Sequence, residues 1–130
     1  MNAPRLLYCH CAYAQVVPNE VKEAVLRKLC DSGVSFEAVA DLCEASARRD
    51  PTLKRLADCG SLKIAACYPR AVKWLFAAAQ SPLPADSTEV LNMRVQTADE
   101  IVAGLMEITV KPNLPTANDA AAPSTEKSVP

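Results

Sequence analysis

Short apolar runs alternate along this chain with segments that begin with helix-start signals, and this alternation constrains the fold more than any other feature. The clearest run is LKIAAC, residues 62–67, which leads directly into Pro69 and Arg70 at the start of a helical segment. Strands buried in a parallel sheet have this short apolar pattern. The alternation therefore predicts an α/β fold.

The same pattern predicts a single three-layer domain with a mostly parallel four-stranded sheet. Strands are expected at residues 6–9, 34–43, 62–67 and 88–94. Residues 34–43 also have good helix propensity, so a helix is the alternative there. Helices are expected at residues 18–32, 50–59, 69–80 and 97–108. Pro51 at a first helical position and the capping box of Thr97 and Glu100 mark two of the helix starts. The crossovers are expected to be right-handed.

The composition changes after Val110. Residues 111–130, KPNLPTANDAAAPSTEKSVP, carry almost no bulky apolar side chains. Such a segment cannot bury enough surface to offset the entropy that it loses on ordering. We therefore expect the domain to span residues 1–110 and a disordered tail to span residues 111–130.

Charge and hydropathy argue against several kinds of partner. The formal net charge is −1, which gives no basis for binding nucleic acid or an anionic membrane surface. No apolar stretch is long enough to span a bilayer, and the first residues turn polar too early for a signal peptide. We expect a soluble, cytoplasmic protein.

Six cysteines are many for a chain of 130 residues. Structural disulfides are rare in the cytoplasm, so metal binding or thiol chemistry is favoured. Strands of a parallel sheet end at the same edge, about 4.8 Å apart, and thiols that follow them can converge on one site. Four cysteines follow predicted strands, namely Cys9, Cys11, Cys43 and Cys67. Cys30 and Cys59 lie at helix ends and are expected near the opposite edge.

Four thiols are the ligand number of an all-cysteine metal site, and two metals compete for it. Zinc usually takes paired Cys-x2-Cys sequences, which this chain lacks. An iron–sulfur cluster also takes four thiolates and tolerates ligands on separate loops. The spacing favours iron–sulfur over zinc, and thiol redox chemistry and inert buried cysteines stay open as alternatives.

Two further side chains are expected near these thiols. Arg70 is three residues after Cys67 in a first helical turn, where it would lie beside a negatively charged cofactor. A solvated surface arginine is the alternative. His10, the only histidine, lies between two thiols, but successive side chains of an extended chain point to opposite faces. We expect it to form hydrogen bonds near the site rather than to be a ligand.

Four motifs in order, LLYCHC, DLCEAS, IAACYPR and VLNMR, resemble the N-terminal domain of the heterodisulfide reductase A family. The resemblance covers about residues 5–105. It implies an α/β domain that binds a 4Fe-4S cluster and takes part in electron transfer. By motif position, the implied cluster ligands are Cys9, Cys11, Cys43 and Cys67.

The chain also lacks features of full-length members of that family. It has only Gly33, Gly60 and Gly104, so it has no GxGxxG for a flavin domain, and it has no Cys-x2-Cys-x2-Cys ferredoxin run. The resemblance therefore implies an electron relay or redox partner of a larger oxidoreductase complex rather than a complete enzyme. Altered residues after Cys11 and Cys43 keep two alternatives: a thiol-redox or zinc-binding module, and a non-redox docking domain, each without the cluster.

Overall fold

All four strands of the sheet run parallel, which confirms the α/β class expected from the sequence. The computed structural model describes residues 4–10 and 17–115. The sheet has the order β2-β1-β3-β4. Its strands are β1 (Arg5–Cys9), β2 (Glu37–Val39), β3 (Leu62–Ala66) and β4 (Thr88–Asn92). The helices are α1 (Asn19–Ser32), α2 (Leu42–Ala47), α3 (Pro51–Ala57), α4 (Pro69–Ala78) and α5 (Ala98–Met106).

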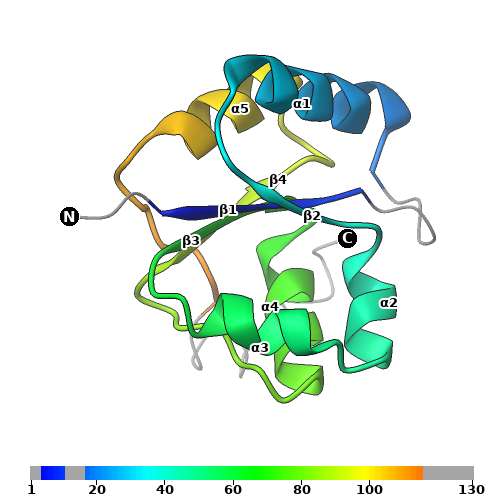
Figure 1. Ribbon diagram of the computed structural model, residues 1–130, viewed down its shortest axis with the longest axis vertical. Helices are drawn as coiled ribbons and strands as arrows, with labels where there is room; N and C mark the ends of the chain where they lie inside the picture. The colour runs from blue at the N-terminus through cyan, green and yellow to red at the C-terminus, as the bar shows by residue number, and fades with distance from the viewer. Residues whose placement is uncertain (1–3, 11–16, 116–130) are drawn as a thin grey trace.

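Helices cover both faces of the sheet and make three layers. Figure 1 shows α1 and α5 above the sheet and α2, α3 and α4 below it. The chain crosses the sheet in one direction from β1 to β2, and in the other direction from β2 to β3 and on to β4. Helices on opposite faces for opposite directions are what a single crossover handedness requires. Within the described ranges, no helix combines the length and hydropathy that a membrane span requires.

The core consists of two apolar layers, one on each face of the sheet. Residues in register on parallel strands point to the same face, so Leu7, Ile64 and Val90 form one buried row. The neighbouring row, which points to the opposite face, consists of Tyr8, Ala65 and Leu91. β2 is an edge strand and is only partly buried. The three longer strands are therefore buried on both faces, which explains their continuous apolar sequences.

The second strand is shorter than predicted, and an unpredicted helix follows it. The expected strand at 34–43 is wrong beyond Val39, because α2 begins at Leu42. The Asp41 carboxylate accepts hydrogen bonds from the backbone N–H groups of Cys43 and Glu44, at 2.8 and 3.2 Å. Such an N-cap stabilises a helix, whereas the alternation of apolar and polar residues mimics a strand. Cys43 therefore lies in the first turn of α2 and not at a strand end.

The fourth strand ends at Asn92, before the predicted end at Arg94. The side chain of Asn92 accepts a hydrogen bond from the N–H of Arg94 at 2.9 Å, and local bonding of this kind favours a turn over a strand. The capping box expected at the start of α5 is confirmed: Thr97 and Glu100 each accept a hydrogen bond from the other's backbone N–H.

The ordered structure continues past the predicted domain end at Val110. The Asn113 side chain accepts from the N–H of Val90 and donates to its carbonyl, both at 2.8 Å. Leu114 is buried, and the Lys73 ammonium donates to the Pro115 carbonyl at 2.6 Å. Residues 111–115 thus cover the open edge of β4, and the expected disorder does not begin at residue 111. The rest of the predicted tail, residues 116–130, lies outside the described residues.

A buried ion pair joins β3, β4 and α5. Lys63 is 0% exposed; its ammonium lies 3.5 Å from the Glu89 carboxylate and donates to the Gly104 carbonyl at 2.7 Å. Glu89 also accepts from the backbone N–H of Lys111 at 3.0 Å. Breaking a buried pair is costly because it leaves one buried charge without its partner. The pair therefore fixes the position of α5 over the sheet.

Replacing Lys63 by methionine should lower the free energy of unfolding by about 3 kcal/mol, because Glu89 would stay buried without its ammonium partner. Urea denaturation followed by circular dichroism measures this change. Lys54→Met is the matched control, since Lys54 pairs with Asp58 on the surface of α3 and such a pair contributes about 0.3–0.5 kcal/mol. Equal losses in the two variants would contradict the structural importance of the buried pair.

The Thr88 hydroxyl at the start of β4 is buried and has no hydrogen-bond partner within the described residues. Thr88→Val removes this group with little change of shape, so it should raise the free energy of unfolding by about 1 kcal/mol. The control is Thr97→Val, which removes the hydroxyl that caps α5 and should cost about 1 kcal/mol. The same denaturation experiment compares them, and a destabilised Thr88→Val protein would show that the hydroxyl is satisfied.

Candidate functional site

The ends of the strands form the carboxyl edge of the sheet, and its centre is a topological switch point. The chain leaves β1 for α1 on one face and leaves β3 for α4 on the other (Figure 1), so the two connections diverge from neighbouring strands. Open parallel sheets bind ligands in the crevice at such a point. Cys9 is the last residue of β1 and Cys67 directly follows β3, so both lie at this switch point.

The strand register brings the backbones of these two residues close together. Tyr8 pairs with Ala65, so Cys9 is level with Ala66, and Cys67 lies one residue further along. With a strand spacing of about 4.8 Å and a rise of about 3.3 Å per residue, their Cα atoms are about 6 Å apart. The convergence of the first and third strand ends is thus a property of the sheet itself.

The sulfur of Cys9 is held by the start of α2. Cys9 is 6% exposed, and its Sγ accepts a hydrogen bond from the N–H of Leu42 at 3.4 Å. Leu42 is the first residue of α2, and Asp41 caps that helix. N–H groups of a first helical turn have no acceptor within the helix. Cys9 therefore provides one.

Cys43 lies next to Leu42 in α2, and its side chain is exposed. It shares the carboxyl edge with Cys9 and Cys67 because α2 begins just after β2 ends. The fourth predicted ligand, Cys11, lies outside the described residues. In the part of the chain that is described, no three His, Cys, Asp or Glu side chains are grouped so that they could hold a metal ion. The three described thiols thus share an edge without forming a closed ligand cage.

Positive charge lies on the α4 side of the crevice. Arg70 is half-buried in the first turn of α4, and the Arg94 guanidinium lies over the ring of Tyr68, 5.2 Å from its centroid. The N-termini of the helices that follow β1, β3 and β4 also point to this edge and carry partial positive charge. Acidic residues in the first turns of α1 and α5 offset that charge on the opposite face, namely Glu20, Asp99 and Glu100.

His10 lies on the face of the sheet away from the Cys9 sulfur. Its Nδ1 is 3.2 Å from the Tyr8 hydroxyl, and that hydroxyl donates to the carbonyl of Lys22 in α1 at 2.8 Å. Tyr8 therefore links β1 to α1, and His10 contacts the Tyr8 hydroxyl from the same face. This hydrogen-bonding position is the one expected for a residue whose neighbour, Cys9, points the other way.

The remaining described cysteines lie where the sequence predicted them. Cys30 is exposed in the last turn of α1, and Cys59 follows α3 near the start of β1. Both are at the edge where the strands begin, called here the amino edge. Burial raises the pKa of the Cys59 thiol, and its sulfur donates to the Ser61 carbonyl at 3.7 Å.

No protein-family model matches this chain, and neither a curated protein nor a solved structure shows significant similarity to it. The resemblance to the heterodisulfide reductase A family therefore stays a prediction from the four sequence motifs.

Sequence reasoning missed Asp41 and the helix that it caps. A signal for them exists, because Asp41 followed by Glu44 matches the start pattern of a helix. The alternation of residues 34–43 concealed it. Recognising that cap would have assigned Cys43 to a helix and identified Leu42 as a backbone donor at the carboxyl edge.

Asp41→Ala should raise the rate at which iodoacetamide labels Cys9 about fivefold. Loss of an N-cap costs about 1 kcal/mol, and opening of the first turn of α2 exposes the sulfur that Leu42 now covers. Mass spectrometry of the labelled peptides measures the rate, with exposed Cys30 as an internal reference. Asp50→Ala is the control, since Asp50 caps α3 and should leave Cys9 protected. An unchanged Cys9 rate in Asp41→Ala would mean that α2 does not control access.

Proposed function

We propose that this protein is a small iron–sulfur protein that carries one 4Fe-4S cluster on Cys9, Cys11, Cys43 and Cys67. It would act as an electron relay or redox partner of a larger oxidoreductase complex. The observation that carries the proposal is the position of Cys9 and Cys67 on either side of the switch point, where α/β sheets bind their ligands. Cys43, at the same edge, supports it.

The surroundings of these thiols support an anionic cofactor. The Leu42 N–H points at the Cys9 sulfur, and hydrogen bonds to sulfur are one of the means by which proteins set cluster potentials. Arg70 and Arg94 supply positive charge on the α4 side. These groups would stabilise negative charge on thiolate ligands and on the cluster that they hold.

A thiol-redox module without the cluster is the second candidate. The observation in its favour is the exposure of Cys43 and the partial exposure of Cys67, because accessible thiols near helix N-termini are the ones that react with oxidants and other disulfides. Its product would be a reversible disulfide at the carboxyl edge, either Cys9–Cys11 or Cys43–Cys67. Stoichiometric zinc in place of iron would indicate the related zinc-binding alternative.

Anaerobic purification followed by iron and acid-labile sulfide analysis tests the proposal. The full chain should be brown and contain iron and sulfide in equal amounts, and Cys67→Ser should lose most of both. Cys30→Ser is the matched control, because Cys30 is an exposed thiol at the opposite edge, and it should keep the cluster.

Two results would overturn the proposal. One is a colourless protein without iron after anaerobic reconstitution, and the other is an intact cluster spectrum in both Cys43→Ser and Cys67→Ser. In the first case, mass spectrometry of the oxidised protein decides between a disulfide and zinc.

A further inference from the structure

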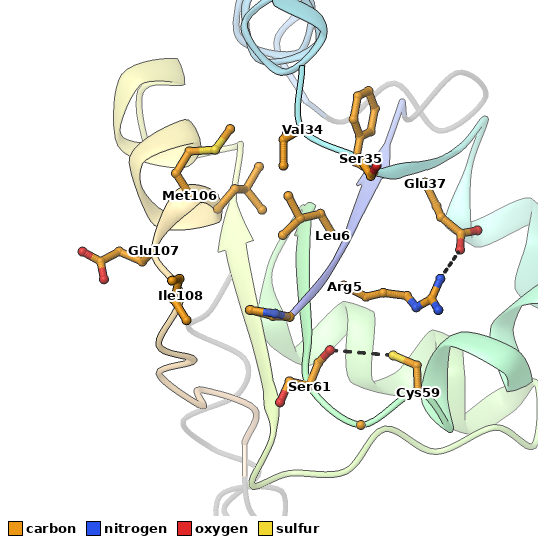
Figure 2. A pocket seen from close by; sticks show the side chains of 14 residues that line it. Arg5, Leu6, Val34, Ser35, Glu37, Cys59, Ser61, Met106, Glu107 and Ile108 are labelled. Carbon is orange, nitrogen blue, oxygen red and sulfur yellow. Dashed lines mark hydrogen bonds and ion pairs between the residues drawn. The ribbon is translucent and has the colours of Figure 1, made fainter. Parts of the chain in front are cut away.

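A cavity lies at the amino edge, opposite the candidate cluster site. It has a volume of about 860 Å³, which is in the range of small-molecule sites. We call it the amino-edge groove. Its apolar wall is formed by Leu6, Val34, Phe36, Leu105, Met106 and Ile108. Figure 2 shows Leu6, Val34 and Met106 around this wall, with Arg5 and Cys59 beside it.

The apolar wall is open to solvent. Met106, the last residue of α5, is 38% exposed, and Ile108, two residues further on, is 66% exposed. Isolated exposed apolar residues are common on protein surfaces. Here they line one concave surface together with buried Leu6 and Leu105, and a concave apolar surface with a few polar groups is the usual form of a ligand site.

At the polar end of the groove, the Glu37 carboxylate is paired with two arginines, Arg5 and Arg55. Arg55 binds Glu37 through two parallel hydrogen bonds, at 2.8 and 2.9 Å. Arg5 reaches only one oxygen of the same carboxylate, at 3.2 Å. Two-point binding to Arg55 is the stronger geometry, so Glu37 is satisfied without Arg5. Of the two arginines, Arg5 is the one that lines the groove. Its side chain leaves β1 on the face opposite to that of Leu6 and is directed toward Glu37 (Figure 2), so a ligand that contacts both residues passes around the start of the strand.

Arg5 forms one ion pair with Glu37, at 3.2 Å, which a ligand carboxylate would share or replace. The hydrogen bond from Arg55 is the largest cause of the lowered pKa of Glu37, and Arg5 lowers it as well, so Glu37 is ionised at neutral pH and Arg55 is its stronger partner. The raised pKa of the Cys59 thiol keeps it uncharged there. Glu107 also lines the groove, but Figure 2 shows its carboxylate turned away from Arg5.

We propose that the amino-edge groove binds a small carboxylate with an apolar body, with the body against Leu6, Met106 and Ile108 and the carboxylate on Arg5. Helix C-termini carry partial negative charge, and those of α1, α3 and α5 lie at this edge. An anion is therefore bound here only where a full positive charge outweighs them, and Arg5 supplies that charge. The proposal is independent of the cluster, which would lie at the opposite edge.

Octanoate titration of the full chain labelled with ¹³C at the methionine methyl groups tests this proposal. Octanoate should shift the Met106 methyl signal saturably and leave that of Met93 unchanged, because Met93 is 0% exposed. Octan-1-ol, which has the same chain without charge, should bind about tenfold more weakly. Octylammonium should bind more weakly still.

Variants test which side chain binds the carboxylate of the ligand and which contacts its apolar body. Arg5→Gln should weaken octanoate about tenfold and leave octan-1-ol unchanged, since only the charged contact is lost. Arg27→Gln, an exposed position on α1 outside the groove, makes the same change in net charge and should bind octanoate normally. Ile108→Glu, at an exposed site, should weaken octanoate without unfolding the protein.

The proposal is overturned if octanoate leaves the Met106 signal unmoved, or if Arg5→Gln and Arg27→Gln bind octanoate equally well. Octylammonium binding as tightly as octanoate would also overturn it, because the helix C-termini and not Arg5 would then determine the charge preference.

Discussion

The pairing of β1 with β3 at the centre of the sheet is the contact on which both candidate sites depend. At its carboxyl end, these strands bring Cys9 and Cys67 to the switch point from which the chain departs to opposite faces. At its amino end, Arg5 and Leu6 form part of the groove. A register shift of one residue would reverse the face to which each side chain points. It would therefore separate Cys9 from α2 and remove Leu6 from the groove at once.

The two edges of the sheet differ in the charge that the helix termini contribute, because each crossover helix follows a parallel strand. Helix N-termini meet at the carboxyl edge, where backbone N–H groups such as that of Leu42 face the sulfur of Cys9. Helix C-termini meet at the amino edge, where the backbone disfavours anions. Positive charge at that edge comes from side chains, namely Arg5 and Arg55 around Glu37. An anion would thus be held largely by backbone dipoles at one edge and by a guanidinium group at the other.

Much of the fold could be predicted because apolar periodicity reflects burial on both faces of a parallel sheet. The run LKIAA is β3, and the capping box of Thr97 and Glu100 starts α5. The errors occurred where local hydrogen bonds compete with periodicity: Asp41 starts a helix inside an apparent strand, and Asn92 ends β4 early. Leu114 is buried although its segment is polar, because Asn113 pairs with the exposed edge of β4. Composition does not record such a long-range contact.

The sequence alone specified the α/β class, the placement of Cys9 and Cys67 at the ends of their strands, and the separation of Cys30 and Cys59 from them. These follow from local periodicity and from the rule that parallel strands end at one edge. Only the tertiary structure decided the order of the strands, and with it the switch point between Cys9 and Cys67. It also decided that Lys63 is buried against Glu89 and that Arg5 lies beside an apolar groove. These contacts join residues far apart in the chain, so no local pattern specifies them.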